Sequence, residues 1–242
     1  MTAAEVLFTY AVSARECGSA RLTVAGETVT LRPSGALWLE AARTLVVADV
    51  HFEKGSAFAR RGQMLPPYDT REALRRLDAE IDDTGVSTIV FLGDAFHDGW
   101  AEERLADDDR ARLQTLGRDH QLVWVVGNHD AEGPKSLPGS VIPDLAYGSL
   151  ILRHEPTQGP APGEVAGHLH PCARVVGKGG STRRRCFITD GERLILPAFG
   201  AFAGGLNVRD QAYSGMFVRA PLAVCLGRGK AHAVAWQRLV GD

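Results

Sequence analysis

Residues 44–55 read Thr-Leu-Val-Val-Ala-Asp-Val-His-Phe-Glu-Lys-Gly. The first five form a continuous, mainly apolar run, which predicts a buried β-strand over 44–48. Asp49 and His51 follow this run directly and are separated by one residue. On an extended chain both side chains would point to the same side, where they could reach one cation. The stretch therefore predicts a strand that ends in metal ligands.

The same arrangement recurs twice in the first half of the chain. Residues 87–92 form a second apolar run, which ends at Gly93-Asp94, and residues 122–126 lead to Gly127-Asn128-His129-Asp130. Between the runs, amphipathic patterns predict helices over 70–83, opened by a capping box, and over 101–116. This alternation of strands and helices implies parallel strands joined by crossover connections.

The pattern changes after Pro143, where short strands follow one another. They indicate a second, mostly antiparallel sheet, and we expect the two sheets to pack face to face with helices outside, in a single domain over residues 1–242. The predicted strands cover residues 149–153, 164–166, 185–189, 193–196, 216–219, 223–226 and 232–236.

Composition narrows the class of protein. The 242 residues are 45% hydrophobic and 23% charged, as in ordinary globular proteins, and no apolar stretch approaches the ~18–20 residues that span a bilayer. The start lacks the pattern of a signal peptide, so we expect a cytoplasmic protein without membrane contact. The four cysteines are scattered, which favours reduced thiols.

The net charge of −2 is not typical of an obligate nucleic-acid binder. Two divalent cations would bring the loaded protein to +2, so charge leaves nucleic acid open as a substrate. Arg183-Arg184-Arg185 is either a solvated hairpin tip or a contact to a phosphate backbone beside the site. Residues 197–205, rich in glycine and aromatics, are either a loop against the substrate or a tight bend.

Two further motifs complete the set of candidate ligands, a single His154 and Gly167-His168-Leu169-His170. Each motif alone is more often a turn than a ligand, but the ordered set indicates two cations at the carboxyl ends of the strands. We assign the first ion to Asp49, His51, Asp94 and His170. We assign the second to Asp94, Asn128, His154 and His168, with Asp94 as the bridging ligand.

Two cations about 3.5–4 Å apart would both contact a scissile phosphate, and a hydroxide held between them would attack phosphorus in line. His129 directly follows a ligand and therefore faces away from it. It is the candidate for binding a phosphate oxygen or for protonating the leaving group, and Asp130, His97 or Asp98 could orient it.

These motifs resemble the calcineurin-like metallophosphoesterase superfamily, whose pattern is Asp-x-His, Gly-Asp, Gly-Asn-His-Asp/Glu, a lone His and Gly-His-x-His. The resemblance spans roughly residues 45–171. It implies a four-layer α/β sandwich of two mixed β-sheets with flanking helices and a dinuclear centre of manganese, iron or zinc. It also implies that His129 is a catalytic histidine that binds no metal. One departure is the residue before His154, which is Arg153 rather than glycine.

Many phosphoprotein phosphatases carry Asp three residues after the bridging Asp, whereas this chain has His97. In this respect it is more similar to the double-strand-break repair nucleases, so we include His97 among the catalytic residues. Residues 45–55, 167–171 and 196–200 resemble the bacterial PdeM group, which is described as ligase-associated DNA-damage-response endonucleases. That likeness implies manganese-dependent phosphodiesterase or nuclease activity and an association with a DNA ligase and helicase.

Three functions are therefore weighed. The leading one is a manganese-dependent phosphodiesterase that acts on nucleic acid, either single-stranded or flapped DNA, with Arg183–Arg185 contacting the substrate. The second is a hydrolase of small phosphoesters, such as a cyclic nucleotide or a nucleotide-linked lipid intermediate. The third is a scaffold that has lost its chemistry, which the complete set of ligand types and His129 argues against.

Overall fold

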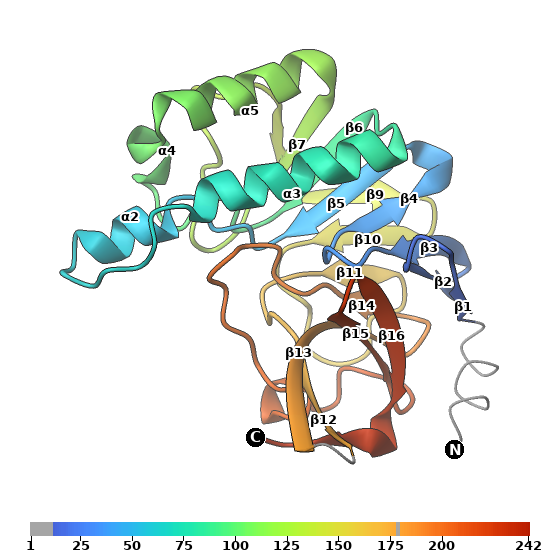
Figure 1. The fold of residues 1–242 in the computed structure, drawn as a ribbon. Helices are drawn as coiled ribbons and strands as arrows, with labels where there is room; N and C mark the ends of the chain where they lie inside the picture. The colour runs from blue at the N-terminus through green and yellow to red at the C-terminus, as the bar shows by residue number, and fades with distance from the viewer. Residues whose placement is uncertain (1–11, 178–179) are drawn as a thin grey trace.

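The computed structural model describes residues 12–177 and 180–242, which build two β-sheets packed face to face (Figure 1). Strands β1 to β5 of the first sheet are antiparallel, and β5 to β8 are parallel. In order across this sheet the strands are β1 (Ser13–Ala14), β2 (Ala20–Val24), β3 (Glu27–Leu31), β4 (Leu37–Leu39), β5 (Thr44–Ala48), β6 (Thr88–Leu92), β7 (Gln121–Val125) and β8 (Ser140–Ile142).

The second sheet is mostly antiparallel, as predicted, but its centre is parallel because β11 runs parallel to both β10 and β14. The main path runs β16-β15-β13-β14-β11-β10-β9, and β12 pairs with β13 and β17. The strands are β9 (Asp144–Tyr147), β10 (Leu150–Arg153), β11 (Glu164–Ala166), β12 (Cys172–Gly177), β13 (Gly180–Thr189), β14 (Leu194–Ile195), β15 (Leu222–Gly227), β16 (Lys230–Ala235) and β17 (Leu239–Val240).

The α-helices of the described residues cover the outer side of the first sheet (Figure 1). They are α2 (Lys54–Ala59), α3 (Asp69–Thr84), α4 (Ala101–Arg104) and α5 (Asp107–Asp119), and short 3₁₀ helices occur at η1 (Glu40–Ala42), η2 (Gln211–Tyr213) and η3 (Trp236–Arg238). The outer side of the second sheet packs instead on η2 and residues 206–217, and residues of β12 and β17 belong to the same apolar cluster. None of the helices in the described part of the chain has the length and apolarity to cross a bilayer.

Alternation along the strands divides the interior into three apolar layers. On β5, Val46 points between the sheets while Val47 points toward the helices. On β13, Phe187 points between the sheets while Ile188 packs on the outer segments. The period of two residues thus buries the facing sides of both sheets and parts of their outer sides, which confirms the predicted sandwich of mixed sheets.

The predicted helix over 101–116 is wrong in one respect, because it is two helices. Leu105 and Ala106 have extended ψ angles of 130° and 148°, and this break lets the buried Leu105 reach the core. Three aspartates then open α5, where negative charge is favourable at a helix N-terminus.

Two other predicted features are also wrong. The capping box of α3 does not form, since Asp69 accepts a hydrogen bond from the Gly55 amide and makes no cap. Residues 216–219 are not a strand, and the Met216 carbonyl accepts a hydrogen bond from the buried Arg193 side chain. Both local patterns are overridden by contacts to distant parts of the chain.

Arg193 allows a test of how the segment after His154 is held. The Arg193 side chain is 1% exposed, lies 2.9 Å from Glu164 and donates to the Thr157 carbonyl. We expect Arg193→Met to lower the free energy of unfolding by about 3–5 kcal/mol, because Glu164 loses its closest cationic partner in a buried position. Urea unfolding measures this, and the half-exposed Arg112 serves as the control. Equal stabilities of Arg193→Met and Arg112→Met would contradict the role of Arg193.

Candidate metal centre

The segments that follow β5 and β6 run side by side and carry the first candidate ligands. The Asp49 amide donates to the Gly93 carbonyl, and the His51 amide donates to the Asp94 carbonyl at 2.9 Å. A further parallel bridge pairs Phe52 with Phe96. These bonds extend the parallel pairing beyond the strands, so they bring Asp49 and Asp94 to the same edge of the sheet.

The backbone at the ligands differs from the extended chain predicted from sequence. Five candidate ligands have φ between 45° and 66°, a region that residues other than glycine seldom occupy: Asp49, His51, Asp94, His168 and His170. The side chains of Asp49 and His51, and those of His168 and His170, are therefore brought together by left-handed residues on either side of Val50 and Leu169, and not by an extended chain. Such conformations cost roughly 1–3 kcal/mol each and are concentrated at functional sites.

One group of donor atoms forms around Asp49. The Nε2 atoms of His51 and His170 lie 3.3 Å apart, and His170 Nε2 lies 3.4 Å from Asp49 Oδ1. Asp49 is fully buried and also accepts the His168 amide hydrogen bond. Asp49, His51 and His170 are close enough together to hold one cation.

A second group forms around His154 Nε2. This atom lies 2.9 Å from Asn128 Oδ1, 3.1 Å from His168 Nδ1 and 3.4 Å from Asp94 Oδ1. His154 is buried, and Arg153 points elsewhere, to Asp144. The missing glycine before His154 therefore does not keep this imidazole from the group. The donor atoms of the seven candidate ligands lie in two groups, with Asp94 in the second, and their roles as ligands stay a prediction. The bridging role of Asp94 stays a prediction.

The donor atoms fit metal ions better than they fit one another. In each group, several imidazole nitrogens and side-chain oxygens that can accept hydrogen bonds lie close together, and few hydrogen-bond donors are present. The buried Nδ1 atoms of His51 and His154 have no hydrogen-bond partner. Burial, with the charges of His170 and Lys54, lowers the pKa of His51 to about 2, so this ring is neutral at pH 7. Neutral imidazole beside carboxylate and amide oxygen is a donor set for divalent transition metals.

Three glycines give the donors room. A Cβ on Gly93 would lie 2.2 Å from His154 Nδ1, one on Gly127 would lie 2.2 Å from Asp94 Oδ1, and one on Gly167 would lie 2.6 Å from Asp49 Oδ2. Of the three, Gly93 also has a positive φ, of 70°. All three glycines therefore serve the close approach of the donors.

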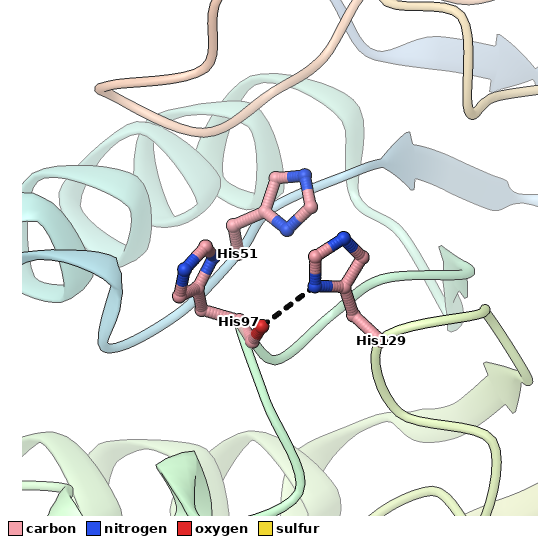
Figure 2. Close-up of side chains that lie close together, drawn as sticks. All are labelled: His51, His97 and His129. Atoms are coloured by element: carbon pink, nitrogen blue, oxygen red, sulfur yellow. Dashed lines mark hydrogen bonds between the residues drawn. The ribbon is translucent and has the colours of Figure 1, made fainter. Parts of the chain in front are cut away.

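His129 is exposed and belongs to neither of these two groups, although its ring lies close enough to those of His51 and His97 for the three to share one ion, so its role as a residue that binds no metal stays a prediction. Its Nδ1 donates to the His97 carbonyl at 2.8 Å, and its Nε2 lies 4.0 Å from Asp94 Oδ2 (Figure 2). Because a carbonyl only accepts, Nδ1 carries the hydrogen and Nε2 is the atom that can exchange a proton with a substrate. Figure 2 shows His51, His97 and His129 with their rings facing a common space.

Asp130, His97 and Asp98 are the three residues that could orient His129, and the backbone carbonyl of His97 is the one that contacts it. Asp130 accepts from the amides of Gly127 and Phe96, and Asp98 pairs with Arg104. The His97 ring lies 5.5 Å from the His129 ring, centroid to centroid. Burial, then the charge of Lys54, lowers the pKa of His97 to about 4, so its ring is also neutral at pH 7.

The arginine run lies within strand β13, away from the tip of its hairpin, and its members have different surroundings. Arg183 contacts Asp242 and donates to the Gly205 carbonyl, while Arg184 is exposed. Arg185 is half-buried and donates to the Ala198 carbonyl at 2.6 Å. A contact of this run with substrate stays a prediction.

Sequence reasoning left the role of residues 197–205 open, and the structure gives them a supporting one. Ala198 bridges to Ala48, and the Gly200 amide donates to the Asp49 carbonyl at 3.2 Å. A Cβ on Gly200 would lie 2.4 Å from the Val50 carbonyl oxygen. This segment therefore packs against the backbone that carries the first ligands. The signal in the sequence was Pro197-Ala198-Phe199-Gly200, but the partner of that motif could not be read from it.

A cleft of about 580 Å³ opens beside the centre. It lies between residues 96–103 and 128–136, and its lining includes Asn128, His129 and Trp100. The exposed Trp100 was not singled out from sequence, because an isolated tryptophan in a loop carries no spacing signal.

Gly93 provides a test of the second donor group. We expect Gly93→Ala to weaken binding of one of two Mn²⁺ ions by about 10- to 100-fold, because the added carbon displaces the His154 ring. Isothermal titration calorimetry measures this. Gly26→Ala is the matched control, since Gly26 has a φ of 88° but no atom within 4 Å of its added Cβ. Unchanged Mn²⁺ binding by Gly93→Ala would show that His154 is not a ligand.

Comparison with known proteins agrees with this geometry. The model of the calcineurin-like phosphoesterase family matches residues 42–192, more than half of the chain. The crystal structure of Pseudomonas putida nuclease MPE is similar at 26% identity and a TM-score of 0.68, over 89% of this chain and 100% of that one.

A phosphoesterase from E. coli, Yfce, is similar at 16% identity over 79% of this chain and 98% of that one, with a TM-score of 0.40, which is too low to establish a shared fold. No protein with a curated description gave a significant match. The family match, the two sheets and the ordered donor groups agree: the chain belongs to the calcineurin-like phosphoesterases.

Proposed function

We propose that this phosphoesterase is a manganese-dependent nuclease that hydrolyses phosphodiester bonds of single-stranded or flapped DNA. The observation that carries the proposal is the placement of the exposed His129 between two donor groups and an open cleft. The likeness to a nuclease over 89% of the chain supports nucleic acid as the substrate. Its similarity to the PdeM group supports a place in DNA repair, with a DNA ligase and helicase as functional partners.

In this proposal Asp49, His51, Asp94 and His170 hold one ion, and Asp94, Asn128, His154 and His168 hold the other. Bound ions would supply charge stabilisation at the phosphoryl oxygens and a nucleophile at neutral pH. The chain itself supplies orientation, because the left-handed backbone and the glycines fix the donors. A set of mixed oxygen and imidazole ligands suits several divalent ions, and the likeness to the PdeM group is what favours manganese among them.

His129 handles the proton in this mechanism. With Nδ1 held by the His97 carbonyl, a protonated Nε2 can give its proton to the oxygen that leaves phosphorus, while the opposite side of phosphorus accepts the incoming oxygen. The neutral His97 ring stands beside it, and we include this ring in the catalytic set. Arg183, Arg184 and Arg185 would contact the backbone of a longer substrate.

A hydrolase of small phosphoesters is the second candidate, because a cleft of about 580 Å³ is of the size that takes one small molecule. The two candidates are separated by offering labelled single-stranded DNA, a labelled flap and cyclic nucleotides under Mn²⁺. We expect the DNA substrates to be cleaved. Turnover of the cyclic nucleotides alone would overturn the nuclease proposal.

His129→Ala tests the proton donor. Its kcat on DNA should fall by about 10²- to 10⁴-fold, because the leaving alkoxide then lacks a proton. The loss should be much smaller on bis(p-nitrophenyl) phosphate, whose leaving group is stable as an anion. Calorimetry should find Mn²⁺ binding unchanged, since His129 belongs to neither donor group. An equal loss on both substrates would show that His129 does not protonate the leaving group.

His97→Ala separates the ring of this residue from its carbonyl. The backbone bond to His129 can persist in this variant, so a fall in kcat on DNA would be due to the ring. We expect a fall smaller than that of His129→Ala, measured on the same substrates. Activity equal to that of the parent would remove His97 from the catalytic residues and leave it an orienting role.

A further inference from the structure

The cleft beside His129 presents an aromatic surface that the proposed chemistry does not use. Trp100 is 64% exposed and lines this cleft together with Asn128 and His129. What distinguishes Trp100 from the equally exposed Tyr68 is its place in the lining of the cleft, where an indole beside a catalytic group is a surface on which a flat ligand can stack.

Trp100 is held in place by a chain of polar contacts. Its amide donates to Asp98 Oδ1 at 2.9 Å, and both oxygens of Asp98 lie 2.9 Å from the guanidinium of Arg104. Arg104 in turn donates to the Ser56 hydroxyl on α2. The backbone that carries the indole is therefore anchored to two helices, which reduces the entropy lost when a ligand binds.

The charges in the cleft disfavour a second phosphate. Glu102, Glu103 and Glu132 line it, against Arg110 and Lys135. Glu132 pairs with Lys135, and Glu102 accepts from the amides of Lys135 and Ser136. This lining is net acidic and would repel a polyanion, but it tolerates a neutral group that stacks and offers hydrogen bonds.

We propose that the cleft binds the nucleobase on the leaving-group side of the scissile phosphate, stacked on Trp100. This proposal rests on the proposed nuclease function and adds to it a specificity-determining residue. The side follows from His129, because the group that receives its proton must depart past this residue into the cleft. Stacking tolerates any base, so we expect a preference for substrates that carry a base on this side over abasic ones, with little discrimination among the bases.

The test uses the thymidine dinucleotide dTpdT and two analogues in which one base or the other is replaced by an abasic tetrahydrofuran. The product that lacks phosphate identifies the leaving side. Trp100→Ala should lower kcat/KM by about 10-fold on the two substrates that keep the leaving-side base, as loss of one base stack predicts. It should match the parent on the third substrate, and Trp100→Phe should retain most of the activity.

Tyr68→Ala is the matched control, because Tyr68 is 62% exposed but does not line the cleft, and it should match the parent on all three substrates. An equal loss by Trp100→Ala on all three, no loss on any, or a loss that follows the opposite base would each overturn the proposal.

A binding measurement keeps the stacking proposal separate from the nuclease function. The indole N–H resonance of Trp100, assigned by its absence in Trp100→Phe, should shift on titration with thymidine, the product of the leaving side, and not with deoxyribose. If that resonance stays fixed, stacking is wrong even when dinucleotides are cleaved. If it shifts while only bis(p-nitrophenyl) phosphate is hydrolysed, the base site stands and the nuclease function fails.

Discussion

The site depends on parallel hydrogen bonding that continues past the ends of β5 and β6. Inside the sheet this pairing is ordinary, but beyond it the amides of Asp49 and His51 still find the carbonyls of Gly93 and Asp94. Two loops that would otherwise diverge are thereby held side by side. The remaining candidate ligands approach these two loops from the ends of β7, β10 and β11.

The centre combines unfavourable local terms with extensive support from the rest of the fold. Left-handed backbone at five ligands and the buried Nδ1 atoms of His51 and His154, which have no hydrogen-bond partner, both cost free energy. The three apolar layers and the segment around Ala198 offset these costs and prevent relaxation. The fold thus holds the donor atoms in an arrangement that cations would stabilise.

The sequence predicted those features that depend on periodicity and order. The strand over 44–48 and the strand over 164–166 were placed at their observed bounds, and the helix over 70–83 lies within α3. The candidate ligands could be expected to gather because parallel strands bring their carboxyl ends to one edge, and their assignment to two ions stays a prediction. These inferences need only local patterns and the rules of sheet topology.

Features that depend on contacts between distant residues could not be predicted. The left-handed residues, the close approach at Gly127 and the packing of Gly200 on Asp49 are properties of the assembled site. The position of the arginine run within β13, rather than at a hairpin tip, could not be predicted because the length of this strand is set by its pairing with β12. The break at Leu105 follows from packing, which helical periodicity does not register.

Asp130 has a consequence for how products escape. Its carboxylate joins the Phe96 amide to the Gly127 amide, and Glu102 joins the opposite end of the same two loops through the amides of Lys135 and Ser136. Hydrogen bonds thus connect the two walls of the cleft at both of its ends. An opening of fixed width would admit and discharge nucleotides without a closing step, and the rate of departure would then reflect how strongly each base adheres.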